Sequence, residues 1–110
     1  MSFQIKKQYQ IVVSGKVQMV RFRERADDLA DEFELTGYVV NFRQKQIFIL
    51  VEGDETDLIR FCDAIRKSPV PIKVKDISVS EHVYEGIYDE FVIKRGEYPE
   101  ELLERFVLPV

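Results

Sequence analysis

The segment from Ser14 to Arg23 holds the residue types that bind phosphate-like anions. Gly15 permits a tight bend, and the loop that follows leads into a helix whose first N–H groups have no partner within the helix. Such donors, at the positive end of the helix dipole, favour an anion. Arg23 falls in the first helical turn, where its planar guanidinium adds donors that match phosphate oxygens. The segment therefore predicts an anion site; the alternative is that its basic residues are only solvated.

The distribution of charge supports this interpretation. The 110-residue chain has 16 Lys and Arg residues and 20 Asp and Glu residues, a formal net charge of −4. The stretch from Gly15 to Arg25 holds four basic residues and one acidic residue, a local balance of +3 that leaves −7 for the remainder. A field of this shape favours a small anionic ligand, whereas a nucleic-acid binder must neutralise many phosphates. RNA binding is also disfavoured because no base-stacking aromatic pattern is present, so we expect no nucleic-acid partner.

The apolar spacing predicts the elements that position the segment. A strand over Tyr9–Ser14 enters the loop, and an amphipathic helix then begins at Phe22 and ends before Gly37. Its apolar stripe is Phe22, Ala26, Leu29, Ala30 and Phe33. Two strands, Tyr38–Phe42 and Gln46–Glu52, flank a polar connection of hairpin length that lacks the usual glycine. We therefore expect a hairpin directly after the first helix.

A second helix follows, with Asp54 as its N-cap and its end near Ser68. Its predicted apolar stripe is Leu58, Ile59, Cys62 and Ile65. Strands over Lys73–Ser80 and Glu90–Lys94 come next. This order predicts an α+β fold, the ferredoxin-like split βαβ sandwich, in which a mostly antiparallel sheet carries two helices on one face. That architecture hosts many functions, so the site must decide between them.

Length and composition indicate one domain. A resemblance described below extends to about Arg95 and implies a domain over residues 1–95 with a C-terminal extension over residues 96–110, which we expect to pack on the same domain. A short helix in the extension would bury Leu102, Leu103 and Phe106. The longest apolar run, Ile47–Val51, is too short to cross a bilayer, and the first residues lack a secretion signal. We therefore expect a cytoplasmic protein without a membrane partner, and a monomer in preference to an oligomer.

The remaining chemistry-bearing residues point to no second active site. Cys62 is the single cysteine and lies on an apolar stripe, so we expect it in the core. His82 is the single histidine, has no serine and acid pattern around it, and is expected at an exposed strand end. No metal-ligand spacing is present, so we expect neither a metal nor a cofactor.

Two motifs resemble the acylphosphatase family. The stretch Gly15-Lys16-Val17-Gln18-Met19-Val20-Arg21-Phe22-Arg23 is similar to the family loop Gly-x-Val-Gln-Gly-Val-x-Phe-Arg. Downstream, Gly37-Tyr38-Val39-Val40-Asn41 matches the family signature Gly-x-Val-x-Asn, and the resemblance extends to about Arg95. It implies hydrolysis of the carboxyl–phosphate bond of acyl phosphates. It also implies that Arg23 and the loop residues Gly15 to Phe22 bind phosphate while Asn41 orients the attacking water.

Physical chemistry permits these roles. Phosphoryl transfer depends on positioning and on charge stabilisation more than on a strong base. The Asn41 amide both donates and accepts, so it can orient a water without titrating. The alternative role for Asn41 is that of a turn residue at a strand end. The expected ligand is a small acyl phosphate or inorganic phosphate.

The loop departs from the family pattern at Met19, which stands where the family has its second loop glycine. A positive φ at this residue would cost about 1–2 kcal/mol. We expect a negative φ, no strain and a usable phosphate site. Arg21 occupies a position that the family varies, and an extra cation there strengthens anion binding. The alternative is a weak or inactive member that binds an anion or acts as a protein-interaction module.

Overall fold

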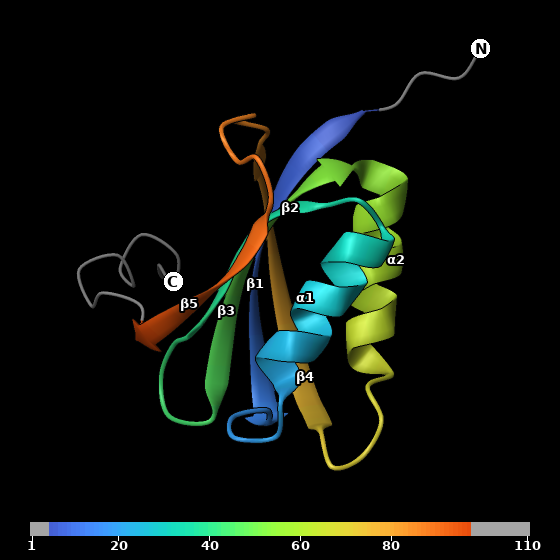
Figure 1. The fold of residues 1–110 in the computed structure, drawn as a ribbon. Coiled ribbons are helices and arrows are strands. Elements are labelled where there is room, and N and C mark those ends of the chain that lie inside the picture. The colour runs from blue at the N-terminus through green and yellow to red at the C-terminus, as the bar shows by residue number, and fades with distance from the viewer. Residues whose placement is uncertain (1–4, 98–110) are drawn as a thin grey trace.

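A computed structural model describes residues 5–97, in which two helices cover one face of a five-stranded sheet (Figure 1). The elements in chain order are β1 (Lys6–Lys16), α1 (Phe22–Glu32), β2 (Thr36–Asn41), β3 (Gln46–Asp54), α2 (Glu55–Arg66), β4 (Lys73–Val83) and β5 (Phe91–Glu97). The strand order is β4-β1-β3-β2-β5, and only the β2 and β5 pair among these described strands is parallel. The predicted ferredoxin-like α+β class is confirmed. The expected helix around Leu102 lies outside the described residues.

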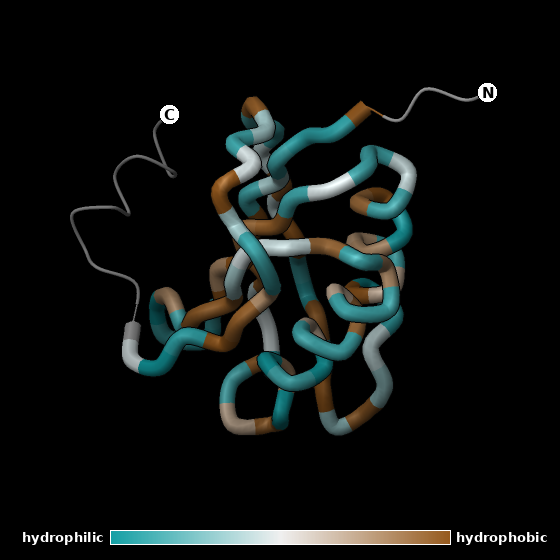
Figure 2. The backbone as a smooth tube through the Cα atoms, turned by 45° about the horizontal axis from the view of Figure 1, so that its top comes forward, coloured by the Kyte–Doolittle hydropathy of each residue, from teal (hydrophilic) through white to brown (hydrophobic). Residues whose placement is uncertain are grey.

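The main core lies between the helices and the sheet, and the helices reach it through apolar stripes. In both helices hydrophilic and hydrophobic residues alternate along the tube, as Figure 2 shows. The buried residues of α1 are Phe22, Ala26, Leu29 and Ala30, all of them predicted. In α2 one prediction is wrong, because Ile59 is 56% exposed whereas Phe61 is fully buried. Leu58, Phe61, Cys62 and Ile65 fall within about 100° of one another around the helix, whereas Ile59 points about 100° away from Leu58 on the side away from Phe61, toward solvent.

The strands extend further than the sequence pattern predicted. β1 begins at Lys6 and ends at Lys16, because it pairs with β3 on one side and β4 on the other. Backbone pairing of this kind includes polar residues that carry no hydrophobic signal. Asp54 precedes α2 as predicted, but its side chain forms no capping hydrogen bond. The backbone N–H of Glu55 instead donates to the carbonyl oxygen of Ile5 at 2.8 Å.

The expected hairpin joins β2 to β3, and its turn forms without a glycine. Lys45 adopts a left-handed φ of 63°, which reverses the chain before β3. The Gln46 N–H donates to the Arg43 carbonyl oxygen at 3.0 Å, and the Phe42 N–H donates to the Gln46 carbonyl oxygen at 3.2 Å. The tip of this hairpin therefore has a defined backbone beside the end of β1.

A second, smaller apolar cluster lies on the sheet face opposite the helices. Its buried members are Val12, Val40, Phe42, Phe48 and Leu50. Because β3 lies between β1 and β2 and contributes to both clusters, every residue from Ile47 to Val51 is buried. A strand covered on both faces has a continuous apolar run in place of alternation. The apolar run that is too short for a membrane is thus an inner strand, and no described helix is long and apolar enough to span a bilayer.

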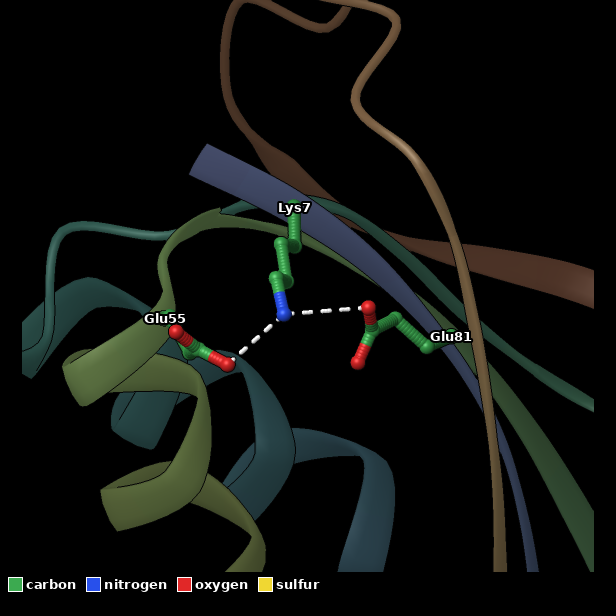
Figure 3. Close-up of polar contacts among 3 residues, drawn as sticks. All are labelled: Lys7, Glu55 and Glu81. Atoms are coloured by element: carbon green, nitrogen blue, oxygen red, sulfur yellow. Dashed lines mark hydrogen bonds and ion pairs between the residues drawn. The ribbon is translucent and has the colours of Figure 1, made fainter. Parts of the chain in front are cut away.

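Polar contacts hold the end of the sheet that lies away from the loop. The Lys7 ammonium on β1 lies between Glu55 at the start of α2 and Glu81 on β4, at 2.7 Å and 3.0 Å (Figure 3). These hydrogen bonds, first that to Glu55 and then that to Glu81, raise the pKa of Lys7 above its ordinary range. The contacts join α2 to two strands of the sheet.

Candidate active site

The chain turns out of β1 at Gly15, where only glycine fits. Its φ is 133°, and a Cβ at this position would lie 2.2 Å from the carbonyl oxygen of Lys73 on β4. The register between β1 and β4 shifts at the step from Ser14 to Gly15. Pairing with β4 nevertheless continues to Lys16, so the irregular loop covers residues 17–21 and not the longer span from Ser14. Gly15 thus sets the direction in which this loop leaves the sheet.

The loop contains two left-handed residues that are not glycine. Met19 has a φ of 60° and Arg21 a φ of 62°, while Val20 between them is not left-handed. The expected negative φ at Met19 is therefore wrong. Arg21 is also the N-cap residue of α1 and makes no side-chain capping bond, so the loop enters the helix through backbone geometry alone. The Met19 side chain is fully exposed.

The backbone of this loop offers free donors. Within residues 5–97, no backbone carbonyl accepts a hydrogen bond from the N–H groups of residues 18–21. Left-handed residues that alternate with others bend successive N–H groups toward one point, an arrangement that binds anions. The first N–H groups of α1 add further donors. Beside them lies a hollow of about 300 Å³, lined by Val17, Met19, Arg21, Phe22, Arg23 and Glu24.

Gln18 holds the loop in place rather than facing an anion with its side chain. Its Nε2 donates to the carbonyl oxygen of Arg43 at 2.7 Å and to that of Gln46 at 2.8 Å. Both acceptors belong to the hairpin between β2 and β3. The motif placed Gln18 in the loop, but no sequence signal identified its partners, which lie 25 and 28 residues away.

Arg23 and Asn41 both lie against β5. Arg23 is half-buried in the first turn of α1, and its Nη1 donates to the carbonyl oxygen of Lys94 on β5 at 3.2 Å. Asn41 is the last residue of β2 and pairs with Glu97 of β5, just after a register shift that follows Val39. The structure therefore brings the two predicted residues to the same end of β5, between Lys94 and Glu97.

The Asn41 side chain has an available acceptor. Its Oδ1 is buried, and no hydrogen-bond partner for it lies within the described residues. A buried amide oxygen without a partner is costly, so a donor that reaches this atom is bound favourably. This is the chemistry required of a group that orients a water molecule.

Other candidate residues belong elsewhere. Arg25, counted in the basic stretch, donates from Nε to Ser68 Oγ at 2.7 Å and from Nη2 to the Ala64 carbonyl oxygen at 3.0 Å. It therefore joins α1 to the end of α2 and does not line the hollow. Burial raises the pKa of the Cys62 thiol to about 11, which keeps it protonated and unreactive. His82 bonds with Ser80 at 2.9 Å.

The fold and loop define a ferredoxin-like α+β protein with a glycine-bent loop at the start of α1, and comparison with known proteins identifies its family. The family model described as Acylphosphatase matches residues 9–93. An acylphosphatase of Thermotoga petrophila is 40% identical over 88 residues, which are 80% of this chain and 97% of that protein. The chain belongs to the acylphosphatase family, as the two motifs predicted, and these similarities favour a hydrolase over an inactive module.

Solved structures agree with this assignment. The crystal structure of acylphosphatase from Bacillus subtilis matches with a TM-score of 0.76 and 38% identity, over 80% of this chain and 98% of that chain. The structure of an acylphosphatase from Coxiella burnetii matches with a TM-score of 0.77 and 27% identity, over 86% of this chain and all of that chain. The family match over residues 9–93 includes the loop, α1 and the end of β2.

Proposed function

We propose that this protein hydrolyses acyl phosphates to a carboxylate and inorganic phosphate. The loop of residues 15–22 and the Arg23 guanidinium hold the phosphoryl group, and the Asn41 side chain orients the attacking water. The observation that carries the proposal is the set of N–H groups at residues 18–21 that have no acceptor within the described chain. Met19 and Arg21, which carry two of these donors, line the same hollow as Arg23.

The chemistry requires little beyond this arrangement. The water oxygen attacks phosphorus, the bond from phosphorus to the acyl oxygen breaks, and the carboxylate leaves with the electron pair. The water protons pass to phosphate and solvent. A carboxylate is a stable leaving group with a pKa of about 4, so it needs no proton from the enzyme. Fixed N–H donors and a guanidinium stabilise the charge on the equatorial oxygens in the transition state.

Asn41 and Arg23 contribute in different ways. The Asn41 Oδ1 accepts a hydrogen bond from the attacking water. This bond fixes the direction of the lone pair of the water oxygen. Arg23 already donates to the Lys94 carbonyl oxygen, and a guanidinium has five N–H donors, so others are available to the phosphate. The Arg23 guanidinium is therefore held in place before the substrate binds.

A direct assay tests the proposal. Purified protein is incubated with benzoyl phosphate, with and without a chelator, and beside the Arg23→Ala variant. We expect chelator-resistant hydrolysis that falls at least about a hundredfold in the variant, the cost of a lost donor in such a site. Arg60→Ala is the matched control, because it removes an exposed arginine of α2 that lies outside the loop and the hollow. Absence of turnover, or an equal loss in both variants, would refute the proposal.

A further inference from the structure

A second hollow, which we call the lysine groove, lies on the other side of the loop. It has a volume of about 850 Å³, and four of its lining residues are Lys16, Lys45, Lys73 and Lys75. The groove and the hollow beside Arg23 share Val17. The lysines come from three places, the end of β1, the hairpin tip before β3 and the start of β4. Folding therefore gathers charges that are scattered in the sequence.

The charge of this groove is largely uncompensated. All four lysines are exposed, and none forms an ion pair with another described residue, in contrast to Lys7 at the far end of β1. Asp76 is the one carboxylate among the lining residues. Four ammonium groups that face one carboxylate in a protein of net charge −4 repel each other, and an anion relieves that repulsion.

The floor of the groove is polar and lies on the sheet face opposite the helices. Ser14 pairs with Gln46 on one side and Asp76 on the other, so the three side chains share one face. Val12, two residues before Ser14, belongs to the apolar cluster of that opposite face. Gln46 Nε2 donates to Ser14 Oγ at 3.1 Å, while Gln46 Oε1 is buried without a partner in the described chain. The groove therefore offers a hydroxyl and an amide beneath the ammonium groups.

We propose that the lysine groove binds a ligand with a run of consecutive phosphate groups, either free polyphosphate or the phosphate chain of a nucleotide. Lysine binds phosphate as a point charge, whereas planar carboxylates are better matched by arginine, which is not among the lining residues of this groove. Four ammonium groups spread over three elements fit several neighbouring charges better than one. A volume of about 850 Å³ accommodates a ligand of nucleotide size.

The groove shares residues 15–18 with the phosphate loop, but neither Arg23 nor the first turn of α1 lines it. Arg23 and the first turn of α1 lie on the helix side, whereas Ser14 and Gln46 lie on the opposite face of the sheet. Substitution of Lys73 and Lys75 removes half of the lysines without touching the loop residues 17–21. Binding at the groove can therefore be lost while turnover is retained.

Calorimetric titration of the Arg23→Ala protein tests the proposal, because that variant weakens phosphate binding at the proposed active site. The ligands are inorganic tripolyphosphate, ATP and AMP. We expect the first two to bind with similar affinity and AMP at least about tenfold more weakly, since it has one phosphate. Adding Lys73→Gln and Lys75→Gln should weaken tripolyphosphate binding at least about tenfold. In the otherwise wild-type protein, the same pair should leave benzoyl phosphate hydrolysis unchanged.

The control pair Lys6→Gln and Lys67→Gln makes the same change in net charge away from the groove. If this pair weakens tripolyphosphate binding as much as the Lys73 and Lys75 pair, net charge alone explains the effect and the proposal is wrong. Binding of ATP without binding of tripolyphosphate would also overturn it, as would tighter binding of a single-stranded dodecanucleotide than of tripolyphosphate. Because calorimetry measures binding and not turnover, it tests the lysine groove even if the protein proves not to hydrolyse acyl phosphates.

Discussion

Arg23 in the first turn of α1 donates from Nη1 to the backbone carbonyl oxygen of Lys94 on β5, at 3.2 Å. This bond spans 71 residues of sequence and holds the guanidinium near the end of β2, where Asn41 lies. A guanidinium that is already fixed loses less freedom when it binds phosphate. The first prediction follows from this geometry.

Arg23→Lys keeps the charge but loses the planar pair of donors and the reach to Lys94. We expect turnover of benzoyl phosphate to fall at least about a hundredfold, as for Arg23→Ala, because a charge-assisted donor in such a site is worth a few kcal/mol. Steady-state kinetics measure the effect. Arg25→Lys is the control, since Arg25 joins the two helices and should affect stability more than turnover. Near-full activity of the Arg23→Lys protein would exclude the proposed role.

Asn41→Ala should separate binding from rate. If Asn41 orients water, turnover falls at least about a hundredfold while inhibition by inorganic phosphate stays within a few-fold of wild type. Thr36→Ala, at the other end of the same strand, is the control and should change neither value much. A parallel loss of phosphate affinity and turnover would place Asn41 in the phosphate site instead.

Met19→Gly should raise stability and change turnover less than about tenfold. The left-handed φ of 60° strains methionine by about 1 kcal/mol, and glycine adopts it freely, although glycine also increases the entropy of the unfolded chain. The fully exposed side chain contributes little to the site. Chemical unfolding and kinetics measure both effects.

Two further variants separate the effect of the Met19 side chain from that of the backbone strain. Met19→Ala removes the side chain but keeps the strain, and Glu34→Gly relieves a similar φ of 57° away from the loop. We expect Glu34→Gly to change stability by a similar amount without any effect on turnover. A gain of a hundredfold or more in turnover for Met19→Gly would show that methionine disables the site.

Gln18→Ala should loosen the loop. It removes two side-chain hydrogen bonds to the hairpin, which together contribute about 1–3 kcal/mol to the free energy of unfolding. Turnover should fall as well, because the N–H groups of residues 18–21 are no longer held in register. Gln44→Ala changes an exposed glutamine in that hairpin and should be nearly silent. Equal stability of the Gln18→Ala protein and wild type would show that these two hydrogen bonds do not hold the loop.

We expect the free energy of unfolding to fall at alkaline pH because the Cys62 thiol is buried. Burial raises its pKa from 9.0 to about 11, so the unfolded chain releases this proton first. Its contribution is present below pH 9 and is lost as the pH rises toward 11, by up to roughly 2 kcal/mol. Cys62→Val should therefore have a flatter stability profile between these pH values. An unchanged profile, or rapid native-state reaction of the thiol at pH 8, would contradict its burial.

The sequence alone was sufficient for the element order, the α+β class and the two family motifs. These follow from short-range patterns, such as the apolar stripe of α1 and the Gly15 bend, which depend on residues within a few positions of each other. It also indicated Arg23 and Asn41 as the residues to examine. Ile59 shows the limit of such patterns, because an apolar residue beside a stripe is not distinguished from one within it.

Only the tertiary structure decided how these parts meet. The partners of Gln18 and Arg23 are backbone carbonyl oxygens 25 to 71 residues away, and a carbonyl is present at every position, so it leaves no mark in the sequence. The left-handed backbone of Met19 depends on the path between the Gly15 bend and α1, which the surrounding structure imposes against the preference of the residue. In the same way, folding brings the Arg25 side chain of α1 against the end of α2 and places Lys16 beside the lysine groove. The sequence determines which side chains are charged, but long-range packing decides which site each charged side chain lines.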